Sequence, residues 1–140
     1  MSYFDTNPKK LKEDLLNLIY IRDMALPDFQ RDFVWQPKQT QELIISLSKS
    51  FPAGSLLRIE STDLMFQPKA FAGAPSLNGH KPKYLVLDGQ QRLTSLYQAL
   101  YGTGDYLFFA DLKKLIDTND VEDAIFYDGK TRANLQESPG

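Results

Sequence analysis

The sequence predicts an α+β domain, a small mixed β-sheet flanked by helices, and three observations lead to that class. Segments with helical spacing of apolar residues alternate with short runs rich in β-branched and aromatic residues. A chain of 140 residues fits one compact domain, and its 42% hydrophobic and 24% charged residues are close to the globular average. Such an alternation of helices and strands is typical of mixed α/β or α+β domains.

The first half of the chain contains two predicted helices and two predicted extended segments. A helix is predicted over residues 8–21, where apolar residues follow helical spacing on one face. Residues 24–35 are expected to start extended, because Pro27 disfavours helix at the residue before it, and to end in a structured loop. A second helix is predicted over 37–50, with a proline suited to its first turn, and a strand over 55–60.

A strand, a glycine turn and a helix form the clearest unit of the sequence. Residues 83–88 are a short apolar run bounded by turn signals, as expected for a buried central strand. A helix is predicted to start near Gln91 and to end at Gly102, a residue type that favours helix C-termini. The preceding residues 61–82 are rich in glycine and proline and lack a periodic apolar face, so we expect a loop that is poorly ordered without ligand.

The C-terminal third is predicted to hold two more strands around a short helix. Residues 106–110 are expected to form a strand, 111–116 a short capped helix, and 121–127 a last strand. The domain is therefore predicted to span residues 1–128, followed by a polar tail over 129–140.

Composition excludes several classes of chemistry. The chain has no cysteine and one histidine, His80, which removes disulfides, thiolate zinc sites, cysteine nucleophiles and histidine-cluster metal sites. His80 itself is expected to be a surface loop residue. The formal net charge of −2 weighs against a broad electrostatic surface for nucleic acid. No apolar run approaches the length of a membrane span, and no secretory signal is visible, so we expect no membrane partner and a cytoplasmic location.

The run Asp88-Gly89-Gln90-Gln91-Arg92 lies where the predicted strand passes into the helix. The first turn of a helix has unpaired backbone N–H groups and a positive dipole end, which bind phosphate readily. Gly89 allows close backbone approach, and Arg92 can offer a bidentate fork to phosphate oxygens. The two glutamines can bind a phosphate, a base edge or an attacking water, and Asp88 can hold Mg²⁺ or orient a water. An Asp-Gly pair alone also forms ordinary turns, but the three long polar side chains that follow favour a ligand site.

A second polar cluster, Gln30 and Arg31, lies among aromatic residues in the loop that precedes the second helix. One interpretation is structural: Arg31 pairs with Asp28 or Asp32 and pins the loop. The other is that the loop packs beside the glycine turn, so that Arg31 and Arg92 face one cleft. The second interpretation explains both polar clusters with one site, and it assigns Gln30 and Arg31 to nucleotide binding.

Three segments of the chain resemble the hallmark segments of the GmrSD N-terminal family: residues 26–35, 51–57 and 84–96, in that order. The combination is specific, although each piece alone is not, and the resemblance runs from the first helix to at least Leu112. That family is related to ParB and sulfiredoxin, whose strand–glycine–helix turn binds nucleotide phosphates. The resemblance therefore implies a ParB/sulfiredoxin-like fold with a nucleotide site at the Asp-Gly-Gln-Gln-Arg turn.

The resemblance also implies a function. Family members belong to restriction and phage-defence systems that act on DNA, and the module is expected to bind a nucleoside triphosphate (NTP) with Mg²⁺ and to hydrolyse it. DNA would be reached through additional domains or subunits, and homo-oligomers are compatible with the sequence. The expected catalytic residues are Asp88, Gln91 and Arg92, with Asp88 as the Mg²⁺ ligand, and the expected nucleotide-binding residues are Gln30, Arg31, Gly89, Gln90 and Arg92.

Two other functions fit the same family. A ParB-like module that binds or nicks DNA is one, and the net charge of −2 without a basic run weighs against it as a separate activity. A protein–protein adaptor that keeps the fold without chemistry is the other, and the intact Gln-Gln-Arg run weighs against it. Fold analogy alone does not decide among the three.

Overall fold

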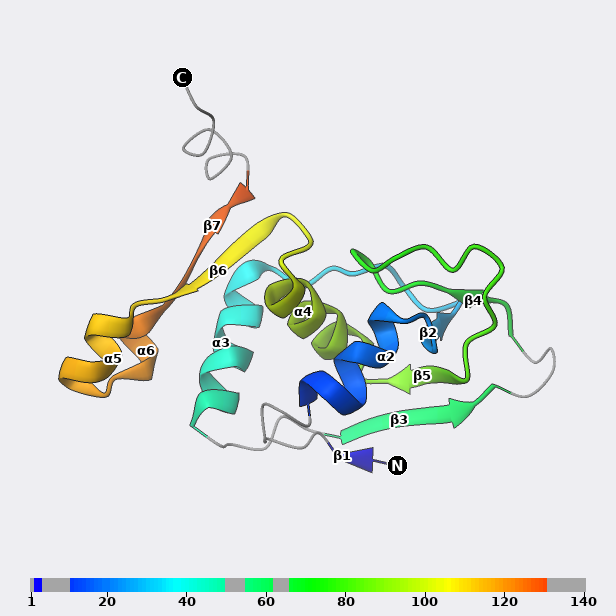
Figure 1. The fold of residues 1–140 in the computed structure, drawn as a ribbon, viewed down its shortest axis with the longest axis horizontal. Coiled ribbons are helices and arrows are strands. Elements are labelled where there is room, and N and C mark those ends of the chain that lie inside the picture. The colour runs from blue at the N-terminus through cyan, green and yellow to red at the C-terminus, as the bar shows by residue number, and fades with distance from the viewer. Residues whose placement is uncertain (1, 4–10, 50–54, 62–65, 131–140) are drawn as a thin grey trace, which may run out of the picture.

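The computed structural model describes residues 2–3, 11–49, 55–61 and 66–130. Within them the chain forms a five-stranded mixed sheet and a separate two-stranded sheet, together with helices (Figure 1). The predicted α+β class is confirmed. The strand order of the large sheet is β1 (Ser2–Tyr3), β3 (Ser55–Glu60), β5 (Tyr84–Asp88), β2 (Met24–Pro27) and β4 (Pro68–Lys69).

Strand β5 lies in the middle of the large sheet, as the sequence predicts. It pairs in parallel with β2 and antiparallel with β3, and Leu85 and Val86 near its centre are buried. A strand that is covered on both faces needs a nearly continuous apolar run, and this one has it. The carboxyl end of β5 therefore leads out of the core directly into the glycine turn.

Helices α3 (Pro37–Ser48) and α4 (Gln90–Tyr101) confirm the two clearest helix predictions. Pro37 occupies the first turn of α3, behind a capping box formed by two glutamines. Gly102 ends α4 in a left-handed conformation with a φ of 67°. The two helices pack against each other. None of the helices in the described ranges is long and apolar enough to cross a membrane.

The first predicted helix is irregular. It consists of a π-helical stretch, η1 (Leu11–Leu16), followed by one α-helical turn, α2 (Asn17–Tyr20). Its predicted start at residue 8 lies outside the described residues. The helical spacing nevertheless identified a buried face, which joins the main core between the helices and the sheet. That core includes Leu16, Ile19, Met24, Leu26, Leu56, Val86, Leu93, Leu96 and Tyr97.

The C-terminal part of the described chain forms an arm, which is a hairpin of β6 (Tyr106–Ala110) and β7 (Ile125–Gly129) with two short helices between the strands. These helices are α5 (Leu112–Thr118) and α6 (Val121–Ala124). Figure 1 shows the arm extending away from the large sheet, with its strands leading to α5 and α6. Strand β6 was predicted with the same bounds, and α5 is capped as predicted, because the Asp111 side chain accepts a hydrogen bond from the backbone N–H of Lys114.

The last predicted strand, over residues 121–127, is wrong in its first half. The Asp120 side chain accepts hydrogen bonds from the backbone N–H groups of Glu122 and Asp123, at 3.0 and 3.4 Å. This is the arrangement of a helix N-cap, and it starts the helical turn α6. The strand begins only at Ile125 and extends through Gly129.

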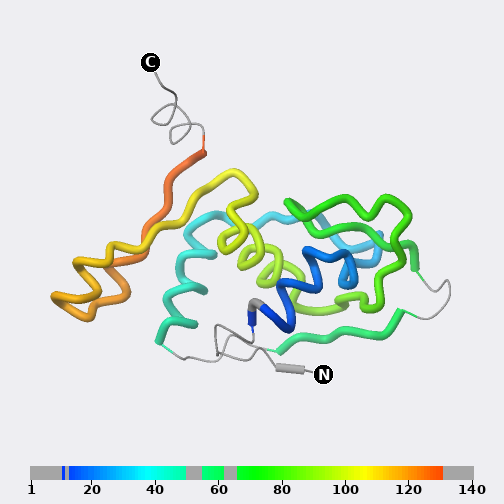
Figure 2. The backbone as a smooth tube through the Cα atoms, in the orientation of Figure 1, coloured from blue at the N-terminus to red at the C-terminus, as the bar shows by residue number. Residues whose placement is uncertain are grey.

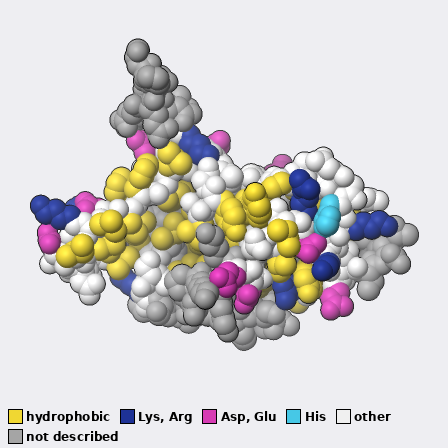
Figure 3. Space-filling view, in the orientation of Figure 1, with side chains coloured by type: hydrophobic (Ala, Val, Ile, Leu, Met, Phe, Trp, Pro, Cys, Tyr) yellow, Lys and Arg dark blue, Asp and Glu magenta, His cyan; other side chains and the backbone are white. Residues whose placement is uncertain are grey.

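The arm carries several exposed apolar side chains. Figure 3 shows hydrophobic side chains gathered over this end of the molecule. The rings of Phe109 and Phe126 stack across the hairpin with centroids 5.2 Å apart, and both remain partly open to solvent. Leu112 and Ile116 on α5 are more exposed still. The main core therefore lies between the large sheet and its helices and not in the arm.

Residues 66–82 are more firmly packed than expected. Strand β4 pairs with β2, and Phe71 is buried in the core at 1% exposure. Figure 2 follows this segment from β4 back to the start of β5. Near its end, His80 is exposed as predicted, with Nε2 lying 2.9 Å from Asp23 Oδ1. Strand β4 and the buried Phe71 therefore lie within the predicted loop, and residues 70–82 form no helix or strand. The expected poor order without ligand stays a prediction, and residues 62–65 lie outside the described residues.

Candidate functional site

The glycine turn leaves the N-terminus of α4 open. Gly89 has a φ of 92°, a left-handed conformation that costs other residues about 1–2 kcal/mol. A Cβ at this position would lie 3.0 Å from Leu56 Cδ1, so a side chain would also disturb packing against β3. Among the described residues, no side chain caps the helix. The positive end of a 12-residue helix is therefore available to an anion.

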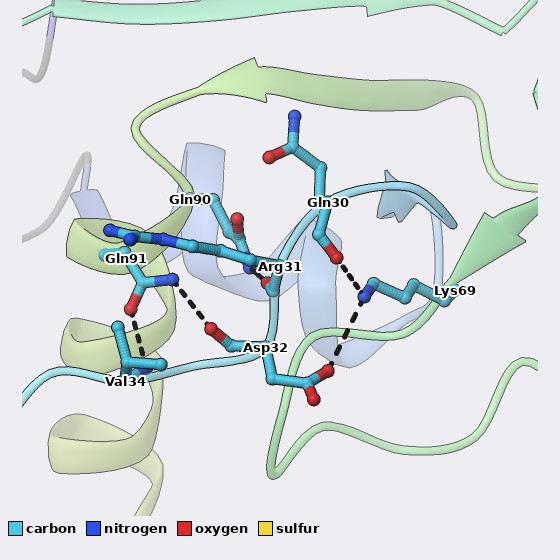
Figure 4. Close-up of polar contacts among 7 residues, drawn as sticks. All are labelled: Gln30, Arg31, Asp32, Val34, Lys69, Gln90 and Gln91. Carbon is cyan, nitrogen blue, oxygen red and sulfur yellow. Dashed lines mark hydrogen bonds and ion pairs between the residues drawn. The ribbon is translucent and has the colours of Figure 1, made fainter.

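Gln90 and Gln91 tie this turn to the loop that follows β2 (Figure 4). The Gln90 side chain is buried and donates from Nε2 to the carbonyl oxygen of Arg31. The amide group of Gln91 is used at both ends: Oε1 accepts from the backbone N–H of Val34 at 2.9 Å, and Nε2 donates to the carbonyl oxygen of Asp32 at 3.1 Å. The two glutamines therefore fix the backbone of residues 31–34, which we call the clamped loop.

The clamped loop is also held from the sheet. Gln30 donates from Nε2 to the carbonyl oxygen of Leu87 on β5, at 3.1 Å. Lys69 on β4 donates to the carbonyl oxygen of Gln30 and lies 3.8 Å from Asp32 Oδ1. These contacts join segments far apart in the sequence. They place the Gln30-Arg31 cluster beside the glycine turn, which confirms the predicted packing of the two clusters.

Arg31 has no partner in the described part of the chain. Its side chain is exposed and extends toward α4 (Figure 4), and it forms no hydrogen bond or ion pair with any described residue. The structural alternative, in which Arg31 pairs with Asp28 or Asp32, is therefore wrong for these residues. Asp32 instead lies near Lys69. The backbone of Arg31 is fixed by Gln90 while its guanidinium group remains available.

The Arg92 side chain, unlike that of Arg31, forms a hydrogen bond with another described residue. Its guanidinium group donates to the carbonyl oxygen of Ser55 at 2.5 Å, which connects the first turn of α4 to the start of β3. The guanidinium also lies near the Gly89 backbone, because a Cβ there would be 3.3 Å from one of its nitrogens. Arg92 is therefore half-buried and positioned by protein contacts, in contrast to Arg31.

Both arginines line one cavity of about 460 Å³, which we call the phosphate cavity after the ligand proposed for it below. The prediction that Arg31 and Arg92 face a shared cleft is thus confirmed. Every residue expected to bind nucleotide or to act in catalysis contributes to its wall. The lining residues are Gln30, Arg31, Trp35, Ser55, Leu87, Asp88, Gly89, Gln90, Gln91 and Arg92.

Asp88 is the carboxylate among the residues that line the phosphate cavity. It is exposed at the end of β5, and its Oδ1 accepts a hydrogen bond from the backbone N–H of Gly89 at 3.0 Å. In the described ranges, no group of three or more His, Cys, Asp or Glu side chains could enclose a metal ion. A single carboxylate suits Mg²⁺, which usually binds one or two carboxylates together with phosphate oxygens and water. The donor set therefore fits a metal that arrives with its phosphate ligand.

A second cavity of about 700 Å³ lies next to the first and was not expected from the sequence; we call it the side cavity. Arg31, Trp35 and Gln90 line both cavities. The remaining walls come from Leu26 on β2, from residues 32–37, from residues 69, 70, 72 and 73, from α4 and from residues 104–106. Five separate segments form this space, so no local motif could have revealed it.

Tyrosines on α4 lie away from these cavities and act in packing. The Tyr97 and Tyr101 rings stack with centroids 4.5 Å apart, and Tyr20 stacks on Tyr101 at 5.7 Å. Burial raises the pKa of Tyr97, and the neighbouring Tyr101 and Tyr20 raise it further. Burial and Tyr20 likewise raise the pKa of Tyr101. Both phenols therefore stay neutral near pH 7 and hold the first helix against α4.

Fold and site together define an α+β domain with a cavity, lined by two arginines, at the junction of a central strand and a helix. A family model described as GmrSD restriction endonuclease, N-terminal domain matches residues 13–138, and the chain belongs to this family. An uncharacterized protein of Methanocaldococcus jannaschii is 41% identical over 127 residues, which is 81% of this chain but 22% of that protein. No solved structure matches the chain, so the ParB/sulfiredoxin-like fold stays a prediction.

Proposed function

We propose that the phosphate cavity binds the triphosphate group of an NTP and that the domain hydrolyses it. The observation that carries the proposal is the Arg31 guanidinium group, which has no partner among the described residues and shares a cavity with Arg92 and the open N-terminus of α4. A free guanidinium, a second guanidinium and a positive helix end all favour a ligand with several negative charges. A triphosphate meets that requirement.

The two glutamines would act as positioning residues. Gln90 and Gln91 hold the backbone of the clamped loop, so they determine where the Arg31 side chain begins. Gln91 Oε1 already accepts one hydrogen bond, and a carbonyl oxygen has a second lone pair. That lone pair could accept a hydrogen bond from an attacking water and so orient it.

Hydrolysis would require in-line attack of water on the γ-phosphorus, with cleavage of the bond to the β–γ bridging oxygen. The products are a nucleoside diphosphate and inorganic phosphate, which keeps one proton of the attacking water, and the other proton is released to solvent. Negative charge on the phosphoryl and leaving oxygens would be stabilised by Arg31 and Arg92. Asp88 would hold Mg²⁺, which neutralises phosphate charge when it is bound. Asp88 could alternatively orient the water, since both roles need an exposed carboxylate at this end of β5.

We further propose that this activity serves a restriction or phage-defence protein that acts on DNA. The family supports this setting, because its description is that of a restriction endonuclease. The chain spans 22% of the length of its archaeal relative, so DNA cleavage would belong to other parts of such longer proteins. NTP binding by this domain would then regulate DNA cleavage by those other parts, or NTP hydrolysis would supply the energy for it.

A panel of the four common NTPs, each with and without Mg²⁺, tests the proposal by thermal unfolding and by phosphate release. A ligand present at 100 times its dissociation constant adds about 2.7 kcal/mol to the free energy of unfolding, which gives a clear rise in melting temperature. We expect at least one NTP to produce this rise with Mg²⁺ and to be hydrolysed. If none of the four changes the melting temperature, the cavity is not an NTP site.

A further inference from the structure

The side cavity has the lining of a site for a planar, polar ring. Its volume of about 700 Å³ falls within the range of about 300–1,000 Å³ that is usual for small-molecule sites. Three aromatic side chains line it: Phe33, Trp35 and Tyr106. Phe33 and Trp35 belong to or adjoin the clamped loop, whereas Tyr106 belongs to the arm. Aromatic walls from two sides suit a flat ring, because they offer stacking surfaces.

Polar groups of the same cavity remain available for hydrogen bonds. Gln98 donates from Nε2 to the carbonyl oxygen of Ala72 at 2.9 Å, but its Oε1 accepts no hydrogen bond from the described residues. The Asp105 carboxylate and the Tyr106 hydroxyl likewise have no hydrogen-bond partner in the described ranges. These groups present acceptors, together with one hydroxyl that can also donate. A ring with N–H donors at its edge would match them.

The side cavity adjoins the phosphate cavity and shares lining residues with it. Arg31, Trp35 and Gln90 line both. Arg31 can therefore contact a phosphate in the phosphate cavity while Trp35 contacts a ring in the side cavity. A ligand with phosphates at one end and a flat, donor-bearing ring at the other has this shape.

From these observations we propose that the side cavity binds the base of the NTP whose phosphates occupy the phosphate cavity. The inference rests on the proposed function and adds the location of base recognition. Tyr106 and Trp35 provide stacking surfaces, and Asp105 and Gln98 read the donors at the edge of the base. The arm thus contributes to specificity, although its residues lie outside the Asp-Gly-Gln-Gln-Arg turn.

Fluorescence of Trp35 reports ligand binding in either cavity, because Trp35 lines both and is the one tryptophan of the chain. The full chain is titrated with the four NTPs, with inorganic tripolyphosphate and with a single-stranded DNA oligonucleotide. The oligonucleotide distinguishes a base in DNA from the base of a free nucleotide. Loss of a base–aromatic stack lowers affinity about 5- to 150-fold. We therefore expect the preferred NTP to bind at least about fivefold more tightly than tripolyphosphate.

Two variants connect this preference to the side cavity. Tyr106→Ala is expected to reduce NTP affinity at least about fivefold and to leave tripolyphosphate affinity unchanged. Tyr127→Ala is the matched control, because Tyr127 packs on Tyr106 in the same hairpin but does not line the cavity. Asp105→Asn keeps the shape of the side chain and is expected to change the order of preference among the four NTPs. This second variant keeps the test informative if Tyr106→Ala perturbs the hairpin.

The outcomes separate the two proposals. If NTPs and tripolyphosphate bind equally well, and neither variant changes NTP affinity or preference, the base is not read in the side cavity, while the phosphate site stands. If the oligonucleotide binds in a Tyr106-dependent manner and free NTPs do not, the mononucleotide assignment is overturned. If neither NTPs nor tripolyphosphate bind, the proposed function fails and this inference fails with it.

Discussion

Removing Arg31 should reduce nucleotide binding without reducing stability. The side chain is exposed and contacts no described residue through a hydrogen bond or ion pair, so Arg31→Ala should change the free energy of unfolding by less than about 0.5 kcal/mol. A charged hydrogen bond to phosphate contributes about 1.5–3 kcal/mol. Its loss corresponds to a decrease in NTP affinity of roughly 10- to 150-fold.

Arg92→Ala should have a different signature, because Arg92 also donates to the carbonyl oxygen of Ser55 at 2.5 Å. Loss of that partly buried bond should lower the free energy of unfolding by about 1.5 kcal/mol, the lower end of the range for a charged donor. NTP affinity should fall as well. The contrast between the two arginines follows from their contacts and not from their residue type.

The assay combines urea unfolding with calorimetric titration of a non-hydrolysable NTP in the presence of Mg²⁺. Lys114→Ala serves as a control, because Lys114 is an exposed cation on α5 and lines neither cavity. Arg31→Lys keeps the charge but loses the bidentate fork, so its affinity should lie between those of wild type and Arg31→Ala. Wild-type NTP affinity in Arg31→Ala would show that the Arg31 guanidinium group does not bind phosphate.

Three other perturbations follow from the same geometry. Gly89→Ala should lower the free energy of unfolding by about 1–2 kcal/mol in urea unfolding, because the left-handed φ of 92° is strained for alanine; an unchanged midpoint would contradict this. Phe71→Ala should cost about 3–5 kcal/mol in the same experiment, since a buried ring is lost, and a cost below 1 kcal/mol would mean that residues 66–82 do not support the core. Asp88→Asn should reduce the rate of phosphate release at least about tenfold while changing NTP affinity much less. If the rate and the affinity fall by the same factor, Asp88 acts in NTP binding and not specifically in hydrolysis.

Much of the fold could be predicted because its signals are local. Pro37 marks the start of α3, Gly102 marks the end of α4, and the apolar run before Asp88 identifies the central strand. The error at residues 121–127 is local as well. The apolar run that ends at Asp128-Gly129 favoured a strand, but the Asp120 side chain caps a helical turn first.

Features that depend on distant contacts were not predictable in the same way. Strand β4 has two residues and exists through its pairing with β2. Phe71 lies among glycines and prolines without periodic neighbours, so nothing in its surroundings indicates burial.

The candidate site was predictable in its members but not in their roles. The Asp-Gly-Gln-Gln-Arg run and the Gln30-Arg31 pair stand out as polar groups among apolar residues, and the structure brings them into one cavity. The sequence does not show that the Arg92 side chain, and not that of Arg31, forms a hydrogen bond with another described residue. Nor does it show that both ends of the Gln91 amide bind the clamped loop, because those contacts join segments about 57–59 residues apart along the chain. The side cavity has the same origin and left no sequence signal.

The most direct test of the central claim is a crystal structure of the chain with a non-hydrolysable NTP and Mg²⁺. We predict phosphate oxygens within hydrogen-bond distance of the Arg31 guanidinium group and of backbone N–H groups in the first turn of α4, at roughly 2.7–3.2 Å. Phosphates bound elsewhere, with Arg31 still without a ligand, would contradict it.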